Sequence, residues 1–389
     1  MNSQNTPVHI KLWHRDFWLM ATSSLLLTMS VYLLIPVMPR WLMEELHFSP
    51  VEVGRSMGVF GLGLYLMGAL CSWLVQHYRR NVVCMWAIVA VAVNLALLWY
   101  VDILRCQMMD LTIIMLHRFL LGATFGLAQM VLSSTLIIDT CESYQRTEAN
   151  HSASWFARFA LSLGPMVGLI VYSLYGFDGV LWGALGCAIA ALVLLKTVSF
   201  PFRSPEEGIK VVSLDRFFLT HGWILFFNLL LVTTVIGLLL TMAFEPLFYT
   251  LMMGGFFLAL LAQRFVFRDA ELKSEIITGL TLLLAALLIL LIAPESPVSP
   301  IFVGLSAGII GSRFLLFFIK LSRHCQRGTS QSTYFLGWET GLSAGLALGY
   351  GCFYEQPTML IYTALALTGS ALLLYHFYTH QWFVRNKNR

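Results

Sequence analysis

FRSPEEGIKVVSLDR, residues 202–216, is the longest polar stretch in an otherwise apolar chain of 389 residues. Apolar runs long enough to cross a membrane lie on both sides of it, six before and six after. A helix needs about 20 apolar residues to cross the hydrocarbon core of a bilayer. The stretch therefore predicts an all-α membrane protein, with twelve transmembrane helices divided into two halves of six.

The composition agrees with a surface that faces lipid. Hydrophobic residues make up 58% of the chain and charged residues only 11%, whereas a soluble domain carries about 25% charged residues. The net charge is +4, and no basic block interleaved with aromatic residues appears, so we expect no nucleic-acid partner. The seven cysteines show no metal-binding spacing, so we expect no metal and no cofactor.

The apolar runs define the expected organisation. We predict an N-terminal six-helix bundle over residues 1–201, a cytoplasmic linker over 202–218 and a C-terminal six-helix bundle over 219–389. The expected spans cover residues 17–38, 52–75, 81–101, 111–138, 152–175, 178–200, 219–241, 243–265, 274–293, 299–321, 332–353 and 357–379.

The distribution of basic residues predicts the orientation. Cytoplasmic segments of membrane proteins carry an excess of Lys and Arg. If both termini lie in the cytoplasm, most of the 24 basic residues fall in cytoplasmic segments, and the outer segments hold only Arg40, Arg55 and Arg105. We therefore expect a multi-pass membrane protein with both termini in the cytoplasm.

An internal repeat relates the two halves. Residues 145–147, Gln-Arg-Thr, align with residues 326–328, Gln-Arg-Gly, at an offset of 181. Residues 75–78 resemble residues 262–265 at an offset of 187. Two parallel repeats are typical of transporters built from related halves, so the offsets predict pseudo-symmetric bundles.

Small residues and prolines mark expected helix contacts and bends. Residues four apart lie along one helix face, and missing side chains let helices approach closely in lipid. Proline removes a backbone hydrogen bond and permits a bend. A tight structural contact alone would also explain this pattern. The residues expected at these contacts and hinges are Gly164, Pro165, Gly168, Gly337, Gly341, Gly345, Gly349, Pro36 and Pro39.

Four charged residues lie well inside the expected spans, away from their ends: Arg118, Arg158, Arg313 and Glu339. A charge within a bilayer span is costly and is a functional candidate by default. The 181 offset places Arg158 and Glu339 at equivalent positions, each about seven residues into its segment and roughly 10 Å deep. We predict that Glu339 binds a proton or reads the charge of a ligand, with Arg158 as its alternate partner. A permanent structural ion pair is the other interpretation.

Charged residues at the expected cytoplasmic ends predict a surface gate. They follow the second span, and they also lie at the end of the fourth span and in the loop after it. The residues assigned to this gate are Gln76, Arg79, Arg80, Asp139, Arg146 and Glu148.

Four short motifs together resemble the major facilitator superfamily. Arg118-x-x-x-Gly122 resembles its span-4 signature, and Gly164-Pro165-x-x-Gly168 resembles its span-5 antiporter signature. The other two motifs are Pro36-x-x-Pro39, which is similar to a signature of the twelve-span drug:proton antiporter branch, and residues 68–80, which resemble the superfamily's cytoplasmic loop. In that loop Gln76 replaces the usual Asp and Arg79 the usual Gly.

The resemblance implies a protein of the inner (plasma) membrane that works by alternating access around a central cavity, usually driven by a proton gradient. We therefore expect a monomeric secondary transporter that exports a small organic molecule in exchange for protons. Three buried arginines against one buried glutamate favour an anionic, zwitterionic or amphipathic substrate. The alternatives are a proton symporter that imports a sugar, peptide or organic acid, and a membrane-embedded lipid enzyme or sensor. No nucleotide-binding or catalytic signature is present, so we do not expect an enzyme.

Overall fold

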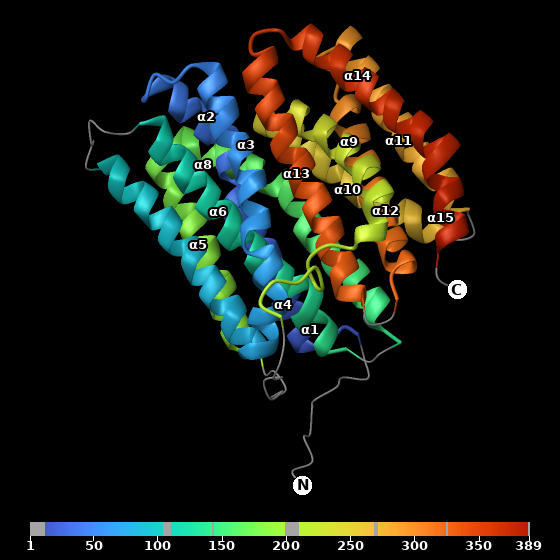
Figure 1. The fold of residues 1–389 in the computed structure, drawn as a ribbon. Helices are drawn as coiled ribbons and strands as arrows, with labels where there is room; N and C mark the ends of the chain where they lie inside the picture. The colour runs from blue at the N-terminus through green and yellow to red at the C-terminus, as the bar shows by residue number, and fades with distance from the viewer. Residues whose placement is uncertain are drawn as a thin grey trace.

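The computed structural model describes residues 12–103, 110–141, 144–198, 210–267, 271–323 and 326–387, without the side chains of 101–103 and Asp139. All regular elements in these ranges are helices, and they form two groups side by side (Figure 1). Residues 202–209 of the expected linker lie outside the described residues, so the domain boundaries stay a prediction.

The first half contains the helices of the first six spans. Span 1 is broken into two helices, as is span 2, and spans 5 and 6 are joined in one helix. The helices are α1 (Arg15–Tyr32), α2 (Leu34–Glu44), α3 (Pro50–Leu66), α4 (Gly68–His77), α5 (Arg80–Ile103), α6 (Leu111–Val131), the π-helix Leu132–Leu136, α7 (Ile137–Asp139) and α8 (Arg146–Lys196).

The second half repeats the pattern with fewer breaks. Its last span is extended through a π-helix into a short terminal helix. The helices are the 3-10 turn Thr220–Gly222, α9 (Trp223–Leu240), α10 (Pro246–Phe265), α11 (Leu272–Ile292), α12 (Val298–Leu321), α13 (Arg327–Phe353), α14 (Pro357–Leu374), the π-helix Tyr375–Thr379 and α15 (His380–Asn386).

The described helices make twelve crossings, which confirms the predicted count. Nine are long and apolar enough by themselves, and the pair α3–α4, bent by 40°, makes a tenth. The 51-residue α8 counts once among the nine but contains two crossings. The twelfth is α13, which is rich in glycine, serine and threonine and mostly buried by other helices. A helix enclosed by protein does not need an apolar surface, so its hydropathy is weaker than that of a span that faces lipid.

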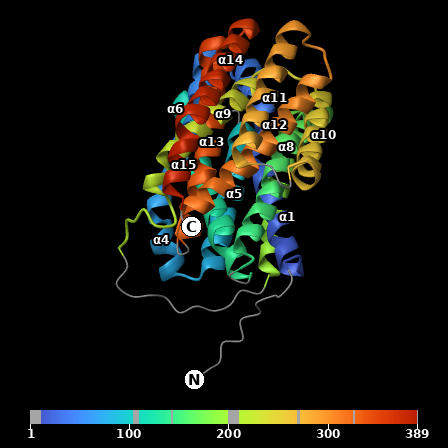
Figure 2. The same cartoon turned by 90° about the vertical axis from the view of Figure 1, so that its right-hand side faces the viewer.

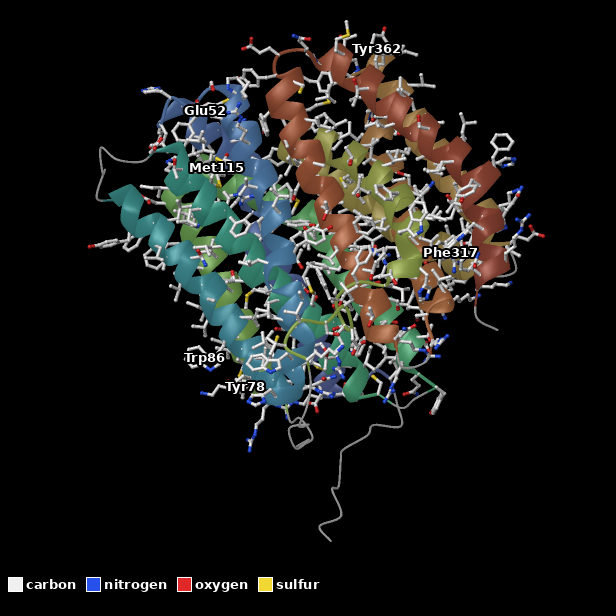
Figure 3. All side chains as sticks on the ribbon, in the orientation of Figure 1. Glu52, Tyr78, Trp86, Met115, Phe317 and Tyr362 are labelled. Carbon is white, nitrogen blue, oxygen red and sulfur yellow. The ribbon has the colours of Figure 1, made fainter. Side chains whose placement is uncertain are left out.

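The two ends of the molecule can be told apart. The start of α1 and the end of α4 lie at the lower end in both views (Figures 1 and 2). We call this the inner end, because it is the end that the positive-inside rule predicts to face the cytoplasm. Glu52 and Tyr362 lie at the opposite, outer end (Figure 3). Trp86, with 68% of its surface exposed, points away from the bundle, as a lipid-facing side chain does (Figure 3).

A single glycine separates spans 5 and 6. Gly176 has φ 67° and ψ −165° inside the otherwise continuous α8. Only glycine adopts such a positive φ without steric cost. The turn between the two spans, expected near residues 176–178, is therefore one residue long.

The offset of 181 relates Gly164 to Gly345 and Gly168 to Gly349, and these glycines have equivalent roles in the two halves. A Cβ atom at Gly164 or Gly168 would collide with Tyr32 or Leu33, at the break between α1 and α2. A Cβ atom at Gly345 would collide with Thr234 and Gly237 of α9. In each half the glycine face of the fifth helix thus lies directly against the first. Gly341 and Gly349 extend the same contact to Thr233 and Thr241, and a Cβ at Gly337 would press on Phe226 and Leu229.

Span 1 breaks where its prolines require it. Pro36 lacks the N–H that would bond to the carbonyl of Tyr32, and Pro39 lacks the bond to Ile35. The helix is interrupted at Leu33, between α1 and α2. The predicted bend therefore lies where the glycine face of α8 contacts span 1.

We expect the substitution Gly168→Ala to destabilise the protein. The new methyl group would meet the backbone carbonyl of Leu33, which cannot move without separating two helices, and overpacking of this kind costs about 1–3 kcal/mol. The measurement is the melting temperature in detergent. Gly186→Ala is the matched control, since nothing lies within 4 Å of a Cβ there. A fall in melting temperature no larger than that of the control would contradict the close contact.

Candidate functional site

A polar cavity lies between the two halves. It contains about 600 Å³ of empty space, part of it open solvent. Helices α1, α6 and α8 of the first half line it together with α13 of the second half, which stands at the centre of the molecule (Figure 1). Its polar lining residues are Ser24, Thr28, Tyr32, Gln129, Ser133, Asn150, Ser154, Arg158, Gln331, Tyr334, Trp338 and Glu339.

One wall is built by hydrogen bonds between α1 and α6. Ser24 and Thr28 lie four residues apart, one above the other on the same face of α1. Gln129 of α6 donates to the hydroxyl of Thr28 at 2.7 Å and accepts from the hydroxyl of Ser24 at 3.2 Å. All three side chains are buried, so these bonds satisfy polar groups that water does not reach and fix this wall.

Glu339 occupies the opposite wall, on α13. Only 4% of its surface is exposed. Its Oε1 accepts a hydrogen bond from the hydroxyl of Tyr32 at 2.7 Å. Tyr32 belongs to the first half and Glu339 to the second, so this bond joins the two halves across the cavity.

Arg158 lies in the same cavity, on α8. Its Nη2 donates to the hydroxyl of Ser154 at 2.9 Å. The guanidinium carbon is 5.1 Å from the ring centre of Trp155 and 5.7 Å from that of Tyr334, within the range of a cation–π interaction. Nε and Nη1 have no acceptor among the described residues. Arg158 therefore keeps two donors for a ligand or for water.

The structure brings Arg158 and Glu339 to one cavity but does not pair them. The ion pairs within the described ranges do not include this one. Helices α8 and α13 begin at Arg146 and Arg327, at the predicted offset of 181. Each charged residue lies twelve positions into its helix, about 18 Å at 1.5 Å per residue. Both helices begin five residues before the apolar runs from which the depth of 10 Å was counted, so that depth within the membrane stays a prediction.

Further buried polar atoms in the cavity have no partner. Both side-chain amide atoms of Asn150 and the Oε1 of Gln331 lack a hydrogen bond within the described part of the chain. Buried polar groups in proteins are nearly always satisfied by protein, water or ligand. Unpartnered atoms gathered in one cavity therefore indicate a binding site.

The other two predicted arginines face elsewhere. Arg118 is buried with its guanidinium carbon 5.0 Å from the ring centre of Phe60, between α6 and α3. Arg313 of α12 forms an ion pair with Glu275 of α11. Neither arginine lines the cavity, so their functional roles stay predictions.

Glu275 corrects the charge balance expected from sequence. Its side chain is 1% exposed, so two carboxylates, not one, are buried in the spans among the side chains that the structure describes. Since Glu275 neutralises Arg313, the surplus of positive charge inside the bundle is smaller than predicted. Glu275 was missed because it lies in the first turn of its span, where a charge normally reaches water.

The expected gate residues lie at the inner end. Gln76 lies in the last turn of α4, and Arg79 and Arg80 follow at the start of α5. Arg146 and Glu148 begin α8, and the side chain of Asp139 lies outside the described residues. A charge network among these residues stays a prediction.

The sequence also contains one signal that we did not use. Ser24, Thr28 and Tyr32 place a hydroxyl at every fourth position of span 1, which also carries Thr22, Ser23 and Ser30. Hydroxyl groups that face lipid would find no hydrogen-bond partner there. The stripe therefore indicates a helix that borders a polar space.

Comparison with known proteins identifies the family. The sequence pattern of the Major Facilitator Superfamily matches residues 20–347. No curated protein sequence matches the chain. Among solved structures, a point mutant of a peptide transporter of the POT family, in complex with alafosfalin, superposes with a TM-score of 0.70 at 12% identity, covering 99% of this chain and 98% of that one.

Two further solved structures have the same fold. The human organic anion transporter MFSD10 (TETRAN) is similar at 15% identity and a TM-score of 0.63, over 93% of this chain and 99% of that one. A point mutant of the nucleoside transporter NupG is similar at 13% identity and a TM-score of 0.62, over 94% and 99%. The chain is therefore a multi-pass membrane protein that belongs to the major facilitator superfamily, a family of secondary transporters and not of enzymes.

Proposed function

We propose that the protein exports a small amphipathic organic molecule that carries an acidic and a basic group, in exchange for protons. The observation that supports this is the pair of opposite charges in one cavity. Arg158 has two donors that no described residue uses. Glu339 lines the same cavity, and the two residues form no ion pair with each other. An acidic group of the substrate would bind Arg158, and a basic group would bind Glu339.

The apolar part of such a substrate also has a surface to contact. Tyr334, Phe335 and Trp338 line the cavity beside the two charges. Sites for small molecules typically combine apolar and aromatic walls with a few placed polar groups. The cavity therefore fits an amphipathic molecule better than a sugar, which needs hydrogen bonds on every side.

Exchange follows from the double use of Glu339. A protonated carboxyl group cannot form an ion pair with a basic group, so proton and substrate exclude each other at this residue. Mutual exclusion at one site, in a carrier that moves only when the site is occupied, exchanges one ligand for the other. The hydrogen bond from Tyr32 must break when the outer end opens, because it joins the two halves.

A second candidate is symport of an organic anion with a proton. Arg158 alone can hold an anion, since its Nε and Nη1 find no acceptor in the described ranges. Protonation of Glu339 would then remove a negative charge from the same cavity and favour the anion. Proton and anion would cross together.

Reconstituted protein separates the two candidates. Proteoliposomes with an imposed pH gradient are given labelled glycyl-phenylalanine (a zwitterion), phenyl phosphate (an anion) or tetraethylammonium (a cation). Exchange predicts uptake of the zwitterion only when the lumen is more acidic than the medium. Uptake of phenyl phosphate driven by an acidic medium supports symport instead. A lack of gradient-driven uptake for all three probes contradicts both candidates.

We expect Tyr32→Phe to shift the protein toward its outward-open form. The substitution removes only the hydroxyl that donates to Glu339, and a hydrogen bond to a charged group is worth about 1.5–3 kcal/mol, or about tenfold or more. The measurement is the rate at which an impermeant maleimide labels a cysteine introduced at Thr241, in a background without native cysteines. Tyr362→Phe, at the outer end of α14, is the control. Equal labelling rates in both variants would show that the bond does not hold the halves together.

A further inference from the structure

A stripe of residues runs along the whole of span 1. Ser24, Thr28 and Tyr32 of α1 line the central cavity. Pro36, Arg40 and Glu44 of α2 line a second pocket toward the outer end. All six residues are spaced by four, and since each step of four residues advances about 40° around a helix, the stripe winds around the span from the central cavity to the outer pocket.

The second pocket also lies between the two halves. It contains about 610 Å³ of empty space, part of it open solvent. The first half contributes α2 and Leu169 of α8, and the second half contributes residues 240–244 together with Tyr350 and Tyr354 at the end of α13. We call it the outer pocket. Its lining thus comes from the outer ends of the same helices α8 and α13 that line the central cavity.

The outer pocket repeats the charge pattern of the central cavity. Arg40 and Glu44 offer one positive and one negative group one helical turn apart. The guanidinium carbon of Arg40 is 5.9 Å from the ring centre of Tyr172, and the Tyr172 hydroxyl donates to Oε2 of Glu44 at 3.4 Å. Tyr172 therefore touches both charged groups and fixes their separation.

Contacts between the two halves separate the two pockets. The hydrogen bond between Tyr32 and Glu339 is one of them. The packing of α3 against α13 is another, because a Cβ atom at Gly54 would meet Ala347 and Gly351. A substrate that leaves Glu339 for the outer side when these contacts part would meet Arg40 and Glu44, which lie further out on span 1.

We infer that the outer pocket is a second binding site for amphipathic zwitterions, occupied on the outer side of these contacts. Arg40 binds the acidic group, Glu44 binds the basic group, and Tyr350 and Tyr354 cover the apolar part. The inference rests on the proposed function for the substrate class, but not on proton exchange.

The test compares the two faces of the membrane at equal pH. Counterflow of tritiated glycyl-phenylalanine is measured in right-side-out and in inside-out membrane vesicles. Arg40→Gln and Glu44→Gln should each raise the KM at the outer face by about tenfold, since each removes a charge-assisted hydrogen bond to the probe. The KM at the inner face should not change. Arg55→Gln, an exposed charge of the outer end that does not line the pocket, is the matched control.

Each other result would overturn the inference. A KM that rises equally at both faces would mean that the variants damage the whole carrier. An unchanged KM at the outer face would mean that the pocket is not occupied. A lack of saturable counterflow in the unaltered protein would exclude zwitterions as its ligands. Failure of pH-driven flux, by contrast, would contradict the proposed exchange and leave this measurement intact.

Discussion

Glu339→Gln should abolish the coupling of transport to the pH gradient, whereas exchange at equal pH should continue with a higher KM, because Gln offers no negative charge to the basic group of the substrate. Gln has the size of Glu and can still accept the hydrogen bond from Tyr32, but its side chain does not bind a proton at the pH values of a transport measurement. Coupling between two ligands is typically worth about 1–3 kcal/mol, or about 5- to 150-fold. We therefore expect gradient-driven uptake in proteoliposomes to fall by about tenfold or more.

Glu295→Gln is the control for this prediction. Glu295 is an exposed carboxylate in the outer turn between α11 and α12, so its loss should leave gradient-driven uptake unchanged. If Glu339→Gln keeps full coupling, Glu339 serves only as the acceptor that joins the two halves. The interpretation of Glu339 as a permanent structural group would then replace its role in proton exchange.

Glu275→Gln should cause the largest loss of stability among single substitutions in the second half. Glu275 and Arg313 pair between α11 and α12, with side-chain exposures of 1% and 14%. Removal of one partner leaves a buried charge without compensation, which costs about 3–5 kcal/mol. The measurement is the melting temperature in detergent.

The double variant Glu275→Gln with Arg313→Gln distinguishes an ion pair from general damage. It removes both charges, so it should recover a large part of the lost stability. Glu271→Gln, an exposed position just before α11, should have little effect. A double variant less stable than either single variant would contradict the pairing.

The helices of this protein were largely predictable, because their signals are local. Apolar runs marked the spans, prolines marked the break in span 1, and the 181 offset anticipated that α8 and α13 begin at equivalent residues. The hydropathy pattern marked α13 as a span only in part, because that helix is surrounded by protein and carries many small residues.

The site was harder to predict, because its contacts join residues far apart in the chain. The sequence indicated Arg158 and Glu339 as charges in equivalent positions, but the bond between Tyr32 and Glu339 spans 307 residues. Arg118 and Arg313 carry the same local signal as Arg158. Only their neighbours, Phe60 and Glu275, show that they lie outside the cavity.

The one-residue turn at Gly176 has a mechanical consequence for the first half. A long loop would let two adjacent crossings move independently of each other. A connection of one residue, Gly176, permits little relative movement between them. Any tilt of the crossing that bears Arg158 must drag its C-terminal neighbour along, and that neighbour exposes Trp182, Ile189 and Val193 on its surface. The surrounding lipid must therefore be displaced on the side of the sixth crossing in every cycle, so the thickness and fluidity of the bilayer should affect how fast this carrier turns over.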